Sequence, residues 1–177
     1  MSAIIYIIET LLSLALFVVL ARLLLQWTRA DFRNPLCQAV VRLTNPLILP
    51  LRRVLPPIGK IDTASVVVVV VVAAVEAACV YALALRALEL PPPLQWLSLV
   101  VAEIARTLLR TYLVAIFLYA ILSLIAPGGY SPLQSVLTSL CEPVLRPIRR
   151  VIPAIAGLDL SPLWAIILIQ AILILMP

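Results

Sequence analysis

Four long apolar stretches, separated by shorter segments of mixed polarity, dominate the pattern of the chain. They predict helical membrane spans at residues 3–27, 63–85, 99–126 and 161–176. The first three have the ~20 apolar residues that a helix needs to cross a ~30 Å hydrocarbon core, whereas the fourth is shorter. The first stretch lacks a basic n-region and a small-x-small cleavage site, so we expect it to be retained as a span and not removed as a signal peptide.

The segments at residues 31–60 and 130–157 mix leucine, valine and isoleucine with arginine and proline. Asn34-Pro35 and Ser131-Pro132 predict helix starts, because Asn or Ser accepts from the first free amides and proline needs no N–H at the first helical position. We expect Asn45-Pro46 to break the first of these helices and the later prolines to prevent a long one. Each segment is therefore predicted to be a kinked amphipathic element at the membrane interface.

These two interfacial segments match each other at an offset of 97 residues. Residues 35–62 and 132–159 align without a gap, and 11 of the 28 aligned positions are identical. The identical positions in the first copy are Pro35, Leu36, Leu43, Pro46, Pro50, Arg52, Arg53, Val54, Pro56, Ile58 and Asp62. The sequence thus predicts a tandem duplication. The expected fold is an all-α membrane protein with four transmembrane helices, arranged as two helical hairpins at residues 1–90 and 94–177, each with one Pro-rich interfacial element.

Composition supports a membrane protein, because 64% of the residues are hydrophobic, 12% are charged and the mean hydropathy is +1.20. Nine of the 13 Lys and Arg residues fall in the first and third predicted loops. The positive-inside rule places both loops in the cytoplasm and leaves both termini and the central linker outside. This distribution explains the net charge of +5, so no nucleic-acid partner is expected.

The chain contains no histidine, which excludes imidazole metal sites, His acid–base chemistry and His ligation of haem. Its three cysteines lack CxxC spacing and are typical of small buried apolar residues: Cys37, Cys79 and Cys141. We therefore expect no metal and no cofactor. An enzyme is the least favoured class, because the only candidate bases near the duplicated arginines are carboxylates.

The duplicated stretch holds the candidate site residues. Four arginines could bind a phosphate or an anionic lipid headgroup, because the guanidinium fork suits such oxygens: Arg52, Arg53, Arg149 and Arg150. In the alternative, mechanical interpretation, prolines shape the turn, arginines extend to the headgroups and aspartates cap the next span. The residues of this structural motif are Asn45, Pro46, Pro50, Pro56, Asp62, Glu142, Pro143, Pro147, Pro153 and Asp159.

Charges inside the predicted spans form a second set. Glu9 and Arg106 are 97 residues apart and should lie at the same depth, and Glu76 and Arg110 both lie about 20 Å from the cytoplasmic ends of their spans. Because an unpaired charge at such depth costs several kcal/mol, we predict that Glu9 pairs with Arg106 and Glu76 with Arg110. A structural clamp is favoured over a proton relay, since a carboxylate beside arginine stays ionised.

The pattern N/S-P-L-x-x-x-V/L-x-x-L-x-N/E-P-x-x-x-P-x-R-R-V-x-P-x-I-x-x-x-D occurs twice and resembles the YggT family of bacterial inner-membrane proteins, with YlmG relatives in Gram-positives, cyanobacteria and plastids. The family pattern has Glu before the second proline and Ser-Pro after the aspartate. The second copy keeps both, as Glu142-Pro143 and Ser161-Pro162, whereas the first copy has Asn45-Pro46 and Ala64-Ser65. This departure argues against a role that needs both glutamates.

The resemblance implies a location in the bacterial inner membrane. Family members are linked to osmotic-stress tolerance and potassium uptake, to septum and nucleoid organisation, and in plastids to assembly of the cytochrome b6f complex. We expect a non-enzymatic scaffold or assembly factor that binds anionic lipid, membrane-protein partners or a second copy of itself. The alternative is a potassium or proton transport-related protein, suggested by the charges within the spans, although no span is interrupted by Gly or Pro.

Overall fold

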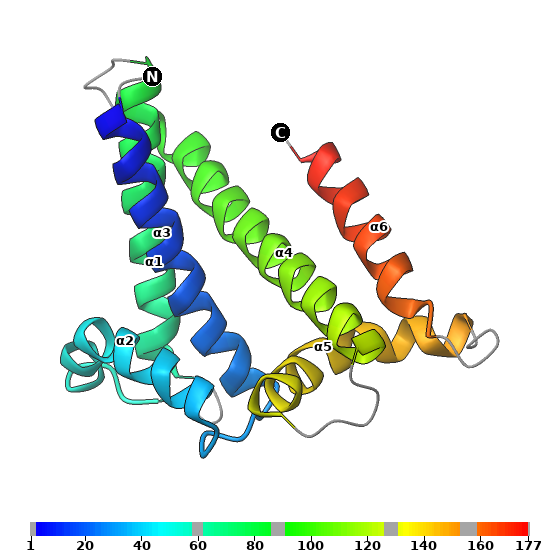
Figure 1. Cartoon of the computed structure of the whole chain (residues 1–177). Coiled ribbons are helices and arrows are strands. Elements are labelled where there is room, and N and C mark those ends of the chain that lie inside the picture. Colours follow the sequence, from blue (N-terminus) through cyan, green and yellow to red (C-terminus); the bar gives the residue numbers. More distant parts are fainter. Residues whose placement is uncertain (1–2, 58–61, 86–90, 126–130, 153–158, 177) are drawn as a thin grey trace. The chain divides into compact units, whose positions relative to one another are not determined.

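The computed structural model describes residues 3–57, 62–85, 91–125, 131–152 and 159–176, and these residues contain six α-helices and no strand (Figure 1). The helices are α1 (Ala3–Trp27), α2 (Pro35–Arg52), α3 (Thr63–Leu85), α4 (Pro93–Ile125), α5 (Pro132–Val151) and α6 (Ser161–Leu175). Three of them, α1, α3 and α4, are long and apolar enough to cross a membrane. The predicted all-α membrane class is confirmed at this level.

Helix α6 has 15 residues, which is about 22 Å of helix and less than the ~20 residues of an ordinary span. The bounds of α1 and α3 agree with the predicted 3–27 and 63–85. Helix α4 begins at Pro93 and not at residue 99, because proline is well accommodated in the first turn, where its missing N–H costs nothing. Residues 58–60, 126, 130 and 153–157, and with them Pro153, lie outside the described residues.

The prediction that proline breaks the interfacial helices was wrong. Helix α2 continues through Pro46 and Pro50, and α5 continues through Pro143 and Pro147. The two prolines in each helix are four residues apart, so they share one face, and all four are exposed. The carbonyl groups that lose an N–H partner therefore face outward, where other donors can reach them, while the buried face keeps its hydrogen bonds.

The chain packs into two compact units, and each is described by itself. The first comprises Met1–Leu23 and Arg42–Leu108, and the second comprises Leu24–Val41 and Leu109–Pro177. These packing units do not coincide with the hairpins expected at residues 1–90 and 94–177, and the division into hairpins remains a prediction from the sequence.

In the first unit, α1 and α3 are joined by a hydrogen bond from Ser13 Oγ to Glu76 Oε1. Both helices bury residues at spacings of three, four and five: Leu16, Val19 and Leu20 in α1, and Val68, Ala73 and Ala77 in α3. These spacings place the buried residues of each helix on one stripe. Small residues such as Ala73 and Ala77 allow close helix approach in a membrane, where packing and not hydrophobic burial drives association.

In the second unit, α5 packs against α6. Helix α5 buries Leu137, Leu140, Cys141 and Leu145, and α6 buries Ser161, Pro162, Ala165 and Ile169. The buried residues of α5 form a narrow apolar stripe, and about half of its other positions are polar, which is the pattern of an amphipathic helix.

The end of α1 also belongs to the second unit, and it has the hydrogen bonds of a Schellman motif. Ala30 N donates to Leu25 O at 2.9 Å, and Arg29 has a left-handed backbone with φ of 55°. Leu25 and Ala30 are buried with Cys37, next to Val40 and Val136. Asn34 Nδ2 then donates to Pro132 O at 2.7 Å, so the start of α2 is fixed to the start of α5.

Candidate functional site

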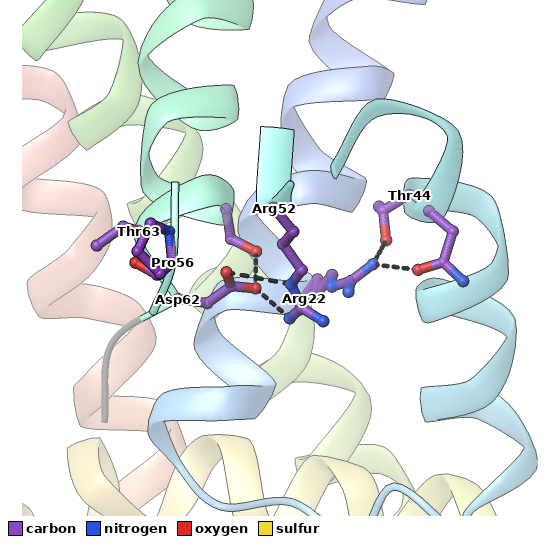
Figure 2. A network of polar contacts seen from close by, with 8 residues as sticks. Arg22, Thr44, Arg52, Pro56, Asp62 and Thr63 are labelled. Atoms are coloured by element: carbon purple, nitrogen blue, oxygen red, sulfur yellow. Dashed lines mark hydrogen bonds and ion pairs between the residues drawn. The ribbon is translucent and has the colours of Figure 1, made fainter. Parts of the chain in front are cut away.

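The first candidate site, termed cluster 1, is a polar network where α2 ends and α3 begins (Figure 2). Arg52 holds Asp62 in a forked ion pair, with Nε donating to Oδ1 at 3.3 Å and Nη2 donating to Oδ2. Ser65 Oγ donates to Asp62 Oδ2 at 2.7 Å, and Thr63 Oγ1 donates to Pro56 O at 2.8 Å. Asp62 therefore connects the last turn of α2 to the first turn of α3.

Helix α1 contributes Arg22 to cluster 1. Its residue is only 2% exposed, and Nη1 donates to Thr44 Oγ1 at 2.7 Å and to Asn45 Oδ1 at 3.0 Å. A buried guanidinium in an apolar helix is costly unless polar groups surround it. The hydroxyl and amide oxygens of α2 supply such groups, so Arg22 ties the end of α1 to the middle of α2, as Figure 2 shows.

The second candidate site, termed cluster 2, is centred on Arg149 of α5. Its Nε donates to Asp159 Oδ2 at 2.8 Å, Nη1 to Glu142 Oε2 at 2.8 Å and Nη2 to Tyr119 OH at 3.0 Å. The guanidinium carbon also lies 5.9 Å from the centroid of the Tyr119 ring. Because Ser161 N donates to Asp159 Oδ1 at 2.9 Å, one arginine joins α4, α5 and the start of α6.

Each cluster contains an equivalent Arg–Asp ion pair, and the residues around that pair differ. Arg52–Asp62 and Arg149–Asp159 have the same spacing of ten residues and lie 97 residues apart. At the surrounding positions, also 97 residues apart, cluster 1 has Arg22 and Asn45 where cluster 2 has Tyr119 and Glu142. Two cations and one anion in cluster 1 thus correspond to one cation and two anions in cluster 2, and the formal charge changes from +1 to −1.

The adjacent arginines of each Arg-Arg pair have different roles. Arg52 and Arg149 are held by carboxylates, although the Arg52 side chain is 40% exposed. The neighbouring Arg53 and Arg150 are also exposed. No ion pair of Arg53 or Arg150 is seen within the described ranges. Of the four arginines predicted to bind an anionic headgroup, two are therefore engaged within the protein, and two are directed to its surroundings.

The charges inside the long helices have near neighbours of their own. Arg106 Nη1 lies 3.3 Å from Glu103 Oε2 one turn earlier in α4, and Glu76 accepts from Ser13. Arg106 is therefore paired with Glu103 in the structure, and its pairing with Glu9 stays a prediction. Pairing of Glu76 with Arg110 also remains a prediction, because these two residues belong to different compact units.

Cys37 of α2 and Cys141 of α5 are buried and are poor nucleophiles. Burial raises the pKa of the Cys141 thiol to about 12, although Arg149 partly opposes the shift. Burial and the charge of Asp31 also raise the pKa of Cys37. Since the thiolate is the reactive form, neither residue has the character of a catalytic or redox cysteine.

Cluster 2 predicts a specific acid sensitivity. Burial alone would raise the pKa of Asp159, but hydrogen bonds from Ser161 and Arg149 outweigh burial and lower that pKa. The ionised carboxylate therefore stabilises the folded protein above its unfolded pKa of about 3.9, and this contribution is lost as the pH falls through the lower folded pKa. In thermal unfolding series, the stability of the wild type should fall more steeply below about pH 4 than that of Asp159→Asn. Parallel curves would contradict this expectation.

The sequence analysis missed the parts played by Arg22, Thr44 and Tyr119 in these clusters. In the sequence, Arg22 has only the appearance of a charge within a span, and nothing marks Tyr119. The repeat offers one indication in the sequence, because the 97-residue offset aligns Arg22 with Tyr119 and Asn45 with Glu142.

The chain is similar in sequence to several known proteins. A family model described as CCB3/YggT matches residues 1–83 and 98–176. An uncharacterized protein of Pseudomonas aeruginosa is 39% identical over 176 residues, which cover 97% of this chain and 86% of the relative. The uncharacterized protein YggT of Escherichia coli K12 is 35% identical over 176 residues, covering 97% and 88%, and an uncharacterized protein of Vibrio alginolyticus is 36% identical over 170 residues, covering 96% and 91%. No solved structure matches the chain. By the extent of these matches, the chain belongs to the CCB3/YggT family.

Proposed function

We propose that this protein is a non-enzymatic scaffold or assembly factor of the bacterial inner membrane, which binds anionic lipid headgroups and membrane-protein partners or a second copy of itself. In this proposal α6 completes a set of four spans, arranged as a tandem repeat of two hairpins. The interfacial helices α2 and α5 lie on the cytoplasmic side, and both termini lie outside. A role in osmotic-stress tolerance or envelope organisation would be exerted through these contacts.

The proposal rests on the different contacts of the two adjacent arginines in each helix. The Asp62 and Asp159 ion pairs fix the end of each interfacial helix, and this leaves Arg53 and Arg150 exposed. An exposed guanidinium at the end of a surface helix is well placed for phosphate oxygens, which it can bind through two N–H groups. Each basic residue near an anionic leaflet contributes about 1 kcal/mol to such binding.

Exposed apolar surface on α6 supports the part of the proposal that concerns partners. Leu168, Ile172 and Leu175 are all about half exposed or more in a helix too short for an ordinary span. A neighbouring helix from another membrane protein or a second copy would cover this surface by close packing. Such a partner would also complete the membrane environment of α6.

The lipid-binding part can be tested by replacing the two exposed arginines. The purified Arg53→Gln/Arg150→Gln variant should bind phosphatidylglycerol about fivefold more weakly per site than the wild type, which corresponds to about 1 kcal/mol per arginine. Native mass spectrometry in detergent measures lipid occupancy directly. Arg53→Lys/Arg150→Lys keeps both charges and should retain most of the binding. Equal phosphatidylglycerol binding by the Gln variant and the wild type would refute the headgroup role.

Ion transport is the second candidate function, and the burial of Glu76 favours it. This carboxyl group is 3% exposed in an apolar helix and accepts a hydrogen bond from Ser13 of α1. Buried ionisable groups in spans mark ion or proton pathways in many transporters. A potassium or proton flux in proteoliposomes that is lost in Glu76→Gln would separate this function from a structural role.

A further inference from the structure

Helix α2 has three distinct faces between Arg42 and its last residue, Arg52. Thr44 and Ile48 lie on the buried face, and Leu43 and Leu47 form an apolar face on which Leu43 is 69% exposed. At 100° per residue, a third face lies beside these leucines and carries four exposed residues of the helix: Arg42, Pro46, Leu49 and Pro50. Exposed Arg53 follows directly after the last residue of the helix. The prolines and the cations of this segment thus share one surface, which we term the Arg-Pro face of α2.

The Arg-Pro face combines cations with hydrogen-bond acceptors. Proline has no N–H, so the carbonyl oxygens of Arg42 and Pro46 lose the donors that residues 46 and 50 would supply in an ordinary helix. A proline bend also tilts such carbonyls away from the helix axis on the proline side. Backbone carbonyls require donors, and on this exposed face water or a ligand can supply them.

A headgroup that fits this face needs an anionic group for arginine and N–H donors for the carbonyls. Pro46 and Arg53 are seven residues apart, which is about 10 Å along the axis and within the combined reach of an arginine side chain and a zwitterionic headgroup. Acyl chains would lie against Leu43 and Leu47, next to the same face. A phosphate linked to a primary ammonium supplies both kinds of group on one molecule.

We propose that the Arg-Pro face of α2 binds phosphatidylethanolamine, with the phosphate on Arg53 and the primary ammonium on the carbonyl oxygen of Arg42 or of Pro46. This site rests on the proposed lipid-binding function and adds selection among headgroups. Phosphatidylcholine has the same phosphate, but its trimethylammonium has no N–H to donate. Phosphatidylglycerol has the phosphate and no cation.

Helix α5 provides an internal comparison. Pro143 and Pro147 lie on an exposed face with Arg146 and Arg150, as in α2. However, Leu140, which corresponds to Leu43, is 6% exposed, so α5 lacks the neighbouring apolar face. The selective site is therefore assigned to α2, and the prolines of α5 serve as the matched control.

The test compares three lipids on the full-length protein in detergent, with occupancies from native mass spectrometry. The wild type should prefer phosphatidylethanolamine over phosphatidylcholine of the same acyl chains by about tenfold, as expected for hydrogen bonds from a charged donor. In Pro46→Ala/Pro50→Ala, the restored N–H groups should engage the two carbonyls, so the ratio should approach one while phosphatidylglycerol binding is unchanged. Pro143→Ala/Pro147→Ala should keep the wild-type ratio.

The outcomes separate this site from the general lipid-binding function. Equal occupancy by phosphatidylethanolamine and phosphatidylcholine in the wild type would overturn the site without any variant. An unchanged ratio in Pro46→Ala/Pro50→Ala would overturn it too, and alanine favours the helix, so this variant should remain folded. Arg53→Gln should weaken all three lipids together. Unchanged binding of all three lipids in Arg53→Gln would overturn the placement of the phosphate on Arg53, and with it the part of this arginine in the proposed function.

Discussion

Arg149→Gln should lower the free energy of unfolding by about 2 kcal/mol, whereas the neighbouring Arg150→Gln should leave it nearly unchanged. Arg149 uses all three guanidinium nitrogens on Asp159, Glu142 and Tyr119, and its removal leaves two carboxylates side by side without their cation. The side chains of Arg149 and Asp159 are 31% and 33% exposed, so solvent screening keeps the effect below the 3–5 kcal/mol of a fully buried pair.

Reversible unfolding in mixed detergent micelles, followed by circular dichroism, measures this difference. The two arginines are adjacent in the sequence and carry the same charge, so their comparison removes any general effect of net charge. Arg149→Gln/Asp159→Asn should recover part of the loss, since the second substitution removes one of the orphaned carboxylates. Equal stabilities of Arg149→Gln and Arg150→Gln would show that the ion-pair network of cluster 2 does not hold the fold.

Glu76→Arg should prevent accumulation of folded protein in the membrane, and Glu76→Gln should be tolerated. Glu76 is buried in α3 against α1, and a larger cation there would displace the helices and lack a carboxylate partner. A Gln side chain has nearly the same shape and can still accept from the Ser13 hydroxyl. Membrane-fraction yield and the unfolding transition of purified protein measure both effects.

Two further measurements give the Glu76 experiment its controls. If Glu76 pairs with Arg110, Arg110→Glu should restore accumulation in the Glu76→Arg background, and a double variant no better than the single one would remove that pairing. Proteoliposomes with a potassium or proton readout address the transport alternative. A flux that the wild type shows and Glu76→Gln lacks would favour transport, whereas no flux from either folded protein would favour the structural role.

The helices were largely predictable because their signals are local. Runs of apolar residues located α1 and α3 to within a residue, and Asn34 and Ser131 before proline marked the starts of α2 and α5. The continuity of α2 through Pro46 was not predictable from the local rule. That rule counts a lost hydrogen bond as a break, but on an exposed face the cost is reduced because the carbonyl can find another donor.

The clusters were only partly predictable, because they depend on contacts between distant segments. Asp62 and Asp159 could be assigned as caps from their position before a span, but their hold on Arg52 and Arg149 requires the return of the chain after each interfacial helix. A pair of adjacent arginines looks uniform in the sequence. Only the fold shows that one member points to a carboxylate and the other outward.

The burial of Cys37 and Cys141 makes the native protein convenient for chemical labelling. A thiol with a pKa of about 12 is thiolate in only about one molecule in 10⁵ at neutral pH, and maleimides react with the thiolate. Cys79 is only partly buried and is replaced by serine for this purpose. A cysteine introduced in place of the exposed Arg53 or Arg150 can then be modified while both buried thiols are left in place. Membrane-impermeant maleimide, applied to intact cells or to inverted vesicles, then reports on which side of the membrane α2 and α5 lie.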